Sequence, residues 1–148
     1  AAHKRMLENL HKGIALPVDL KDQTIYFAGP APAKPNEPIG SVGPTTSYRM
    51  DAYSPETIEL GLTCMIGKGA RSKEVVDAMK KYGAVYIGAV GGAGALISQC
   101  VKKCEVVDYA DLGSEAIHRL EVVDFPGIVI IDSQGNNLYE TEPPKYKK

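Results

Sequence analysis

Residues 54–90 read SPETIELGLTCMIGKGARSKEVVDAMKKYGAVYIGAV, a stretch in which capping residues and glycines separate helical from extended segments. A helix is predicted to begin with Ser54 as its cap and to end at Gly61, because a hydroxyl at the N-cap accepts a backbone N–H bond and glycine favours the left-handed C-cap. A short apolar run then predicts a strand. A second helix, capped by Ser72 and closed by Gly83, and a second strand repeat this order. Alternation of this kind predicts the α/β class.

The same reasoning extends outward from this stretch. Strands are expected at residues 24–28, 62–66, 84–90, 105–109, 127–132 and 137–139. Further helices are expected at residues 3–11 and 114–120, with a short one ending at Cys100. The proline-rich segment 29–40 is expected to be an ordered loop, because proline fixes φ and removes a backbone donor. We expect the first third of the chain to add strands or a β layer.

Composition narrows the class of protein. The 148 residues are 44% hydrophobic and 24% charged, which suits one folded domain, expected at residues 1–140 with a frayed tail at 141–148. A net charge of −1 gives no electrostatic reason to expect nucleic acid or an anionic membrane as a partner, and no apolar run is long enough to span a bilayer. Three cysteines do not suggest a disulfide framework, so a reducing cytoplasm is the expected compartment.

Residues 43–49, GPTTSYR, are the first candidate site. The consecutive hydroxyls of Thr45, Thr46 and Ser47 would compete for backbone hydrogen bonds in a helix, so a loop is expected. In a loop they can donate to an anion, and Arg49 adds a planar fork that matches a carboxylate. The alternative is a solvated turn in which Arg49 forms a surface salt bridge.

The triplet Gly67-Lys68-Gly69 is the second candidate site. Glycine on both sides lets a ligand approach the backbone, and the segment lies between a predicted strand and a capped helix, where anions often bind. Lys68 would supply a point charge. The alternative is a flexible turn with a solvated Lys68, beside which Arg71 and Lys73 would be ordinary surface charges.

Other patterns are weaker. The glycines of residues 88–94 fail the G-x-G-x-x-G spacing, because Ile97 occupies the third position, and close strand–helix packing explains them better than a nucleotide. Cys100 and Cys104 would share one face of a continued helix, but together with Cys64 they match no strong zinc or cluster pattern. Buried, apolar cysteines are the preferred interpretation.

The histidines His3, His11 and His118 show no ligand spacing. His11 and His118 are expected at the surface of amphipathic helices. No metal site is therefore predicted in this chain.

Several segments together resemble a known family. They are GPTTSYRMD (43–51), IGKGARS (66–72), YGAVYIGAVGGAGAL (82–96) and the stretch from Cys104 to Asn136. With the upstream segment LPVDLKDQTIYFAGPAPAKPNEPIGSVGPTTS, they resemble, in the same order, the C-terminal domain or β subunit of class I fumarases and L-tartrate dehydratases. The resemblance covers the chain from about Ala1 to Tyr139.

The resemblance implies a hydro-lyase that adds or removes water across the double bond of a small dicarboxylate. Hydration of fumarate to malate is the first expectation and dehydration of tartrate the second. A four-iron iron–sulfur cluster with one open iron would act as Lewis acid, held by three cysteines of a partner α subunit and not by this chain. The chain would then be a swivelling β/β/α domain and a β subunit, active only in a hetero-oligomer whose dimerisation is left open.

The resemblance also implies roles for particular residues. The loop from Thr45 to Arg49 would contact a substrate carboxylate, Lys68 would bind substrate, and Thr45 would lie near the proton transfer. A threonine needs a partner carboxylate for that task. The expected catalytic residues are therefore Thr45, Arg49 and Lys68, and the expected substrate-binding residues are Thr45, Thr46, Ser47, Tyr48, Arg49 and Lys68.

The sequence departs from the family at two places. A ring at Tyr48 stands where a small residue is common, which would alter the pocket. A Gly-Arg-Asp stretch with a substrate-binding arginine would precede Ala1, so we expect a trimmed chain that lacks this arginine, with His3 either a remnant of that site or a residue at a helix N-terminus. Two other functions stay open: a non-catalytic small-molecule-binding or regulatory domain, and a nucleotide-binding α/β domain that rests only on the glycines.

Overall fold

The computed structural model of the chain describes residues 1–90 and 92–146 and consists of two compact units. Unit 1 is made of residues Ala1–Asp19, Ala28–Thr45 and Val90–Pro126. Unit 2 is made of residues Leu20–Phe27, Thr46–Ala89 and Gly127–Lys148. Each unit therefore gathers segments that lie far apart in the sequence.

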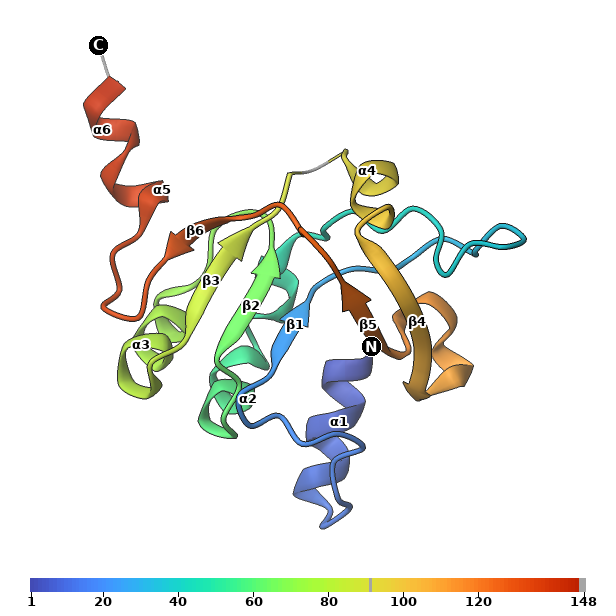
Figure 1. Ribbon diagram of the computed structural model, residues 1–148. Coiled ribbons are helices and arrows are strands. Elements are labelled where there is room, and N and C mark those ends of the chain that lie inside the picture. The colour runs from blue at the N-terminus through green and yellow to red at the C-terminus, as the bar shows by residue number, and fades with distance from the viewer. Residues whose placement is uncertain (91, 147–148) are drawn as a thin grey trace. The chain divides into compact units, whose positions relative to one another are not determined.

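Unit 2 is built on a four-stranded sheet (Figure 1). Its strands, in spatial order, are β1 (Thr24–Tyr26), β2 (Cys64–Gly67), β3 (Val85–Gly88) and β6 (Ile128–Ile131). The first three are parallel, and β6 runs antiparallel to β3. The register aligns Met65 with Tyr86 and Tyr86 with Ile131, so that these fully buried side chains share one face of the sheet.

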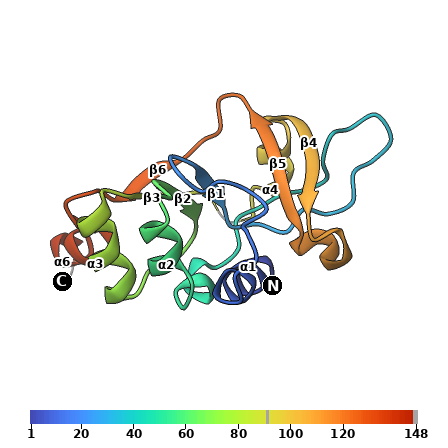
Figure 2. The same cartoon turned by 90° about the horizontal axis from the view of Figure 1, so that it is seen from below.

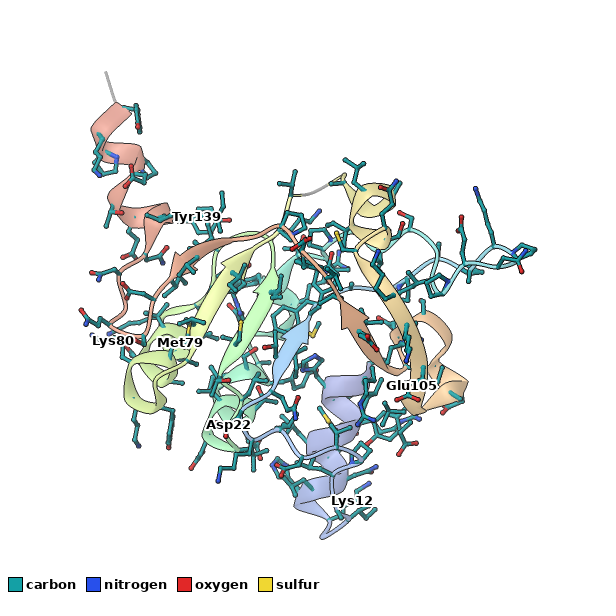
Figure 3. All side chains as sticks on the ribbon, in the orientation of Figure 1. Lys12, Asp22, Met79, Lys80, Glu105 and Tyr139 are labelled. Carbon is teal, nitrogen blue, oxygen red and sulfur yellow. The ribbon has the colours of Figure 1, made fainter. Side chains whose placement is uncertain are left out.

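Two helices cover that face, α2 (Ser54–Glu59) and α3 (Lys73–Tyr82), and Figure 2 shows both on the same side of the strands. Figure 3 shows Met79 on the side of α3 toward the strands and Lys80 on its outer side, which agrees with their burial. The buried core of the unit is formed by Phe27, Ile58, Leu62, Met65, Val75, Met79, Ala84, Tyr86 and Ile131. Apolar residues at helical spacing thus pack onto a sheet of alternating pattern, and the predicted α/β class is confirmed.

The ends of these helices test the predicted caps. Ser72 accepts a bond from the backbone N–H of Val75 at 3.4 Å, and Gly83 ends α3 with φ of 82°, as predicted. Ser54 is not a cap, because it is the first helical residue of α2, and its hydroxyl donates to the carbonyl of Met50 at 2.9 Å. The hydroxyl that was expected to cap the helix therefore binds a backbone carbonyl that precedes the helix.

The C-terminal segment of unit 2 is helical. The strand predicted at 137–139 is wrong, since that region forms α5 (Leu138–Thr141), capped by Asn137, with only an isolated bridge between Asn137 and Ile131. The tail continues into α6 (Pro143–Tyr146), while residues 147 and 148 lie outside the described residues. Asn137 accepts a bond from the backbone N–H of Tyr139 at 3.0 Å, and a cap of this kind favours a helical turn over a short strand.

Unit 1 contains α1 (Ala2–His11), α4 (Gly94–Ser98) and an antiparallel pair of strands, β4 (Val101–Asp108) and β5 (Ile117–Val122). The helix predicted at 114–120 is wrong, because a 3-10 helix at Ala110–Glu115 leads directly into β5. Cross-strand ion pairs join Lys103 to Glu121 at 3.7 Å and Arg119 to Glu105 at 3.2 Å. These opposite charges face each other across the two strands, and such pairing outweighs a weak helical pattern.

The first third of the chain, which was expected to add strands or a β layer, adds strand β1, whereas the separate two-stranded sheet comes from residues 101–122. Within 29–40 the structure has no strand, and only an isolated bridge joins Ala28 to Pro44. The glycine-rich turn packs tightly, as expected: a Cβ on Gly94 would lie 2.7 Å from the nitrogen of Gly43. Gly91 of that turn lies outside the described residues.

An ion pair connects α1 to the 3-10 helix of unit 1. Arg5 donates two hydrogen bonds to the carboxylate of Asp111, at 2.7 and 2.8 Å, and its guanidinium lies 5.0 Å from the ring centre of Tyr109. The bond from Arg5 lowers the pKa of Asp111 below its ordinary value. Across residues 1–90 and 92–146, every helix is too short or too polar to cross a membrane.

Candidate functional site

The two candidate segments meet in unit 2. The backbone N–H of Ser47 donates to the carbonyl of Lys68 at 2.9 Å, and Thr46 forms a parallel bridge with Lys68. Lys68 directly follows β2, and Ser47 begins a 3-10 helix, Ser47–Met50. The hydroxyl-rich loop and the Gly-Lys-Gly turn are therefore neighbours through backbone hydrogen bonds, which the sequence pattern did not predict.

Two cations lie on these paired segments. Arg49 is exposed and Lys68 is half-buried. In the described part of the chain, neither side chain forms an ion pair or a hydrogen bond to a protein group. The surface salt bridge that served as the alternative for Arg49 is therefore not found there. Thr46 is exposed as well, and Tyr48 is 66% exposed.

Ser47 faces inward, unlike its neighbours. It is fully buried, with its hydroxyl oxygen 2.8 Å from the hydroxyl of Tyr86, which also lies 2.9 Å from the carbonyl oxygen of Gly69. A phenol has one proton and a carbonyl can only accept, so a consistent pattern has Tyr86 donating to Gly69 while Ser47 donates to Tyr86. Burial raises the pKa of Tyr86, partly opposed by the bond with Ser47. The phenol therefore stays protonated and joins the two segments.

Gly67 permits this close approach. A Cβ at Gly67 would collide with the hydroxyl of Ser47 and lie 3.0 Å from the ring of Phe27. Gly69 has φ of 85°, which favours glycine. The glycines around Lys68 thus serve the packing of the two segments, in addition to any approach of a ligand that the sequence suggested.

Arg71 is the residue that sequence reasoning missed. Its side chain is fully buried, where a surface charge was the alternative considered, and its Nε donates to Asp51 at 2.7 Å. The other oxygen of Asp51 accepts from the backbone N–H of Ser72 at 2.6 Å, and a second nitrogen of Arg71 donates to the hydroxyl of Ser54 at 2.7 Å. The only hint in the sequence is an aspartate that ends the hydroxyl-rich loop and an arginine that precedes a helix cap.

Aromatic rings enclose the same guanidinium. Its carbon lies 5.2 Å from the ring centre of Phe27 and 4.9 Å from that of Tyr86. Stacked rings favour arginine over lysine at such a site. The guanidinium of Arg71 therefore has hydrogen-bond partners and aromatic contacts. The guanidinium of Arg49 is exposed and has no protein partner in the described residues.

Thr45 belongs to unit 1, whereas Thr46, Ser47, Tyr48, Arg49 and Lys68 belong to unit 2. Its side chain is exposed and follows Pro44, which bridges to Ala28. The structure thus brings together five of the six predicted site residues, and the predicted role of Thr45 in proton transfer stays a prediction.

The cysteines do not converge on a metal. Among residues 1–90 and 92–146, no three His, Cys, Asp or Glu side chains are grouped so that they could hold a metal ion. All three cysteines are free and half-buried, and burial raises the pKa of Cys64 and of Cys104. The helix does not continue to Cys104, which lies in β4 opposite Leu120, so Cys100 and Cys104 share no helix face. An iron–sulfur cluster requires converging thiolates, so these residues do not fit one.

The histidines occupy three different settings. His3 is half-buried in α1, and His11 is exposed at the end of that helix. His118 lies in β5 and not on a helix, with its Nδ1 3.0 Å from the carbonyl oxygen of Ala116. The predicted helical surface position of His118 is therefore wrong.

Comparison with known proteins shows the family to which the sequence is related. The sequence model of the family described as "Fumarase C-terminus" matches residues 1–142. The chain is 42% identical over 94% of its length to the aerobic class I fumarate hydratase of Salmonella typhimurium, covering 24% of that protein. It is 42% identical over 95% of its length to fumarate hydratase 1, mitochondrial, of Leishmania major, covering 26%. It is also 42% identical over 94% of its length to the putative L(+)-tartrate dehydratase subunit beta of Methanocaldococcus jannaschii, covering 74%.

This chain belongs to the fumarase C-terminus family. The expected resemblance is thereby confirmed. The chain spans about a quarter of the length of the fumarate hydratases that it matches, and about three quarters of the tartrate dehydratase subunit.

Proposed function

We propose that this chain is the substrate-binding part of a hydro-lyase, of the β-subunit type, that reversibly hydrates a small dicarboxylate. Fumarate-to-malate conversion is the first candidate reaction and tartrate dehydration the second. One observation carries the proposal: Arg49 and Lys68 lie on two segments joined by backbone hydrogen bonds, and neither cation has a protein partner in the described part of the chain. Membership in the fumarase C-terminus family supports it.

The chemistry of the two cations suits a dicarboxylate. A planar guanidinium can bind one carboxylate with two hydrogen bonds, and an ammonium can bind the other as a point charge. Thr46, which is exposed and pairs with Lys68 through the backbone, adds a hydroxyl donor to the same segments. Holding both carboxylates fixes the double bond between them, and fixed orientation is a large part of catalysis. Thr45 is proposed to act near the proton transfer, together with a carboxylate that accepts its proton.

The iron–sulfur cluster is proposed to belong to a partner α subunit, since the three cysteines of this chain do not converge on one place. When bound there, such a cluster would supply a Lewis acid. The relative from Methanocaldococcus jannaschii is named as a beta subunit, which supports a two-chain enzyme. We infer a hetero-oligomer in the cytoplasm, where reducing conditions keep three free cysteines in the thiol form.

The test is a reconstitution. This chain is mixed anaerobically with a candidate cluster-bearing partner, and hydration of fumarate and dehydration of tartrate are measured. We expect activity only in the mixture. Arg49→Ala and Lys68→Ala should each abolish or strongly weaken it, whereas Lys12→Ala, which removes an exposed charge from unit 1, should not.

Two outcomes would contradict the proposal. A stable complex with an intact cluster and no activity toward either acid would exclude these substrates. Failure to form any complex, together with dicarboxylate binding by the chain alone, would favour the non-catalytic binding domain.

A further inference from the structure

We infer that Arg71 and Asp51 are positioning residues, which form a buried brace that holds Arg49 and Lys68 in the arrangement that binds the dicarboxylate. This inference rests on the proposed function. It assigns a role to two residues that the hydroxyl-rich loop and the Gly-Lys-Gly turn do not include.

The charges of this pair are buried. The side chain of Arg71 is fully buried and that of Asp51 is 8% exposed. Removing such a pair from water costs so much that well-packed apolar residues of the same size are often at least as stabilising. Packing of the core therefore does not require this pair, and the structure itself shows what else it does.

The pair also connects the two segments that carry Arg49 and Lys68. Asp51 directly follows the 3-10 helix that carries Arg49, and Arg71 lies three residues after Lys68. Asp51 accepts both from Arg71 Nε and from the backbone N–H of Ser72. One carboxylate thus fixes the end of the loop to the end of the turn.

A second set of contacts joins the same two segments at their other end. There the backbone of Ser47 bonds to Lys68, and the hydroxyl of Tyr86 lies within hydrogen-bond distance of both Ser47 and Gly69. Segments 46–51 and 67–72 are therefore fastened at both ends, with Arg49 between the fastenings and Lys68 at one of them. Ser54 closes the brace, since it accepts from Arg71 and donates to the carbonyl of Met50.

A consequence for binding follows. In the described residues, the side chains of Arg49 and Lys68 have no protein partner. The backbone of the two segments therefore determines where these side chains are placed. If the brace loosens, the arrangement that binds both carboxylates is populated less, and the apparent affinity falls in proportion. The effect should appear mainly in KM, because the brace touches no reacting atom.

The experiment compares wild type with the double variant Arg71→Met/Asp51→Asn in the assembled enzyme. Methionine fills similar space, and asparagine keeps an acceptor for the N–H of Ser72, so the thermal midpoint should stay near that of wild type. We expect KM for fumarate and malate to rise at least tenfold with a smaller change in kcat. Hydrogen exchange should quicken in peptides covering 46–51 and 67–72.

The matched control is Arg5→Met/Asp111→Asn, an arginine–aspartate pair of unit 1. It should change neither KM nor exchange in those peptides. A second readout tests whether the brace acts partly through Arg49: in an Arg49→Ala background, the brace variant should raise KM by a smaller factor than it does in wild type. If the double variant does not fold, Tyr86→Phe loosens the other fastening and should also raise KM.

The results separate the two ideas. Unchanged KM or unchanged exchange in an active enzyme overturns the inference and leaves the proposed function intact. Fully additive effects of the brace and Arg49→Ala also overturn it. If the wild-type assembly is inactive, the proposed function fails, and exchange that is unchanged in the double variant overturns the brace as well.

Discussion

Arg49 and Arg71 carry the same guanidinium on two neighbouring segments of unit 2, yet their environments are opposite. Arg71 is fully buried, bonded to Asp51 and Ser54, and placed against two aromatic rings. Arg49 is exposed and has no protein partner in the described residues. One arginine is therefore held by protein groups on all sides, whereas the other has no such partner in the described residues.

The difference teaches how the two kinds of charge act on energy. A buried charge costs a great deal to desolvate, so its partners must remain in place and its loss affects folding. An exposed charge costs little, so its loss affects folding hardly at all and affects anion binding directly. The comparison can be tested by separating these two effects.

The largest expected effect is that of Arg71→Ala. It leaves the carboxylate of Asp51 nearly buried without its cation, and breaking such a pair costs about 3–5 kcal/mol of the free energy of unfolding. Chemical denaturation with Arg5→Ala as the control should show a much smaller loss for the exposed pair. Equal losses of the free energy of unfolding in Arg71→Ala and Arg5→Ala would show that burial does not distinguish the two arginines.

Arg49→Ala should show the opposite profile. The free energy of unfolding should change by less than about 0.5 kcal/mol, as for other exposed positions. Dicarboxylate binding by the assembled enzyme should weaken by about 1.5–3 kcal/mol, the contribution of hydrogen bonds to charged groups. Parallel loss of stability and binding would show that Arg49 has a structural role.

Gly67→Ala sharpens the comparison without touching a charge. The new methyl group would collide with the hydroxyl of Ser47 and press on Phe27, so the segments must shift. Overpacking of this kind costs about 1–3 kcal/mol in thermal or chemical unfolding. Gly29→Ala is the control, because its methyl would meet Ser114 at an ordinary 3.6 Å. If Gly67→Ala left the free energy of unfolding unchanged, the two segments would be able to shift at little cost.

The smallest effect concerns the exposed pair of Arg5 and Asp111. The hydrogen bond from Arg5 lowers the pKa of Asp111 below 3.8 in the folded protein. The pair therefore contributes stability above the pKa of the unfolded carboxyl, and this contribution is lost as the pH falls through the folded-state pKa. Unfolding of wild type and Arg5→Met at pH 7 and pH 3 should show a difference that shrinks at low pH. A difference independent of pH would mean that Arg5 acts by packing.

Local rules predicted the elements whose signals are local. The cap at Ser72, the stop at Gly83 and the strand that became β3 follow from short-range chemistry. Residues 114–120 and 137–139 were predicted wrongly, since β5 depends on pairing with β4 and the last turn depends on the cap at Asn137. The residues of one short segment do not reveal which other segment it will pair with.

The candidate site shows the same division. Residue types pointed to Thr46, Arg49 and Lys68 as anion-binding groups, and they now lie on joined segments. Sequence could not separate Ser47 from them, because its burial against Tyr86 is decided by strand β3. Nor could it distinguish the buried Arg71 from a surface charge.

The sequence by itself determined the α/β class, the family and the residues proposed to bind a dicarboxylate, because periodicity, caps and motif order can be read along the chain. Only the tertiary structure decided which arginine is buried. Asp51 and Arg71 are 20 residues apart, and their hydrogen bond exists because the sheet of unit 2 brings both segments to the same place. Burial and partnership are properties of three-dimensional packing, and they determine whether a charge holds the fold or stays free to bind.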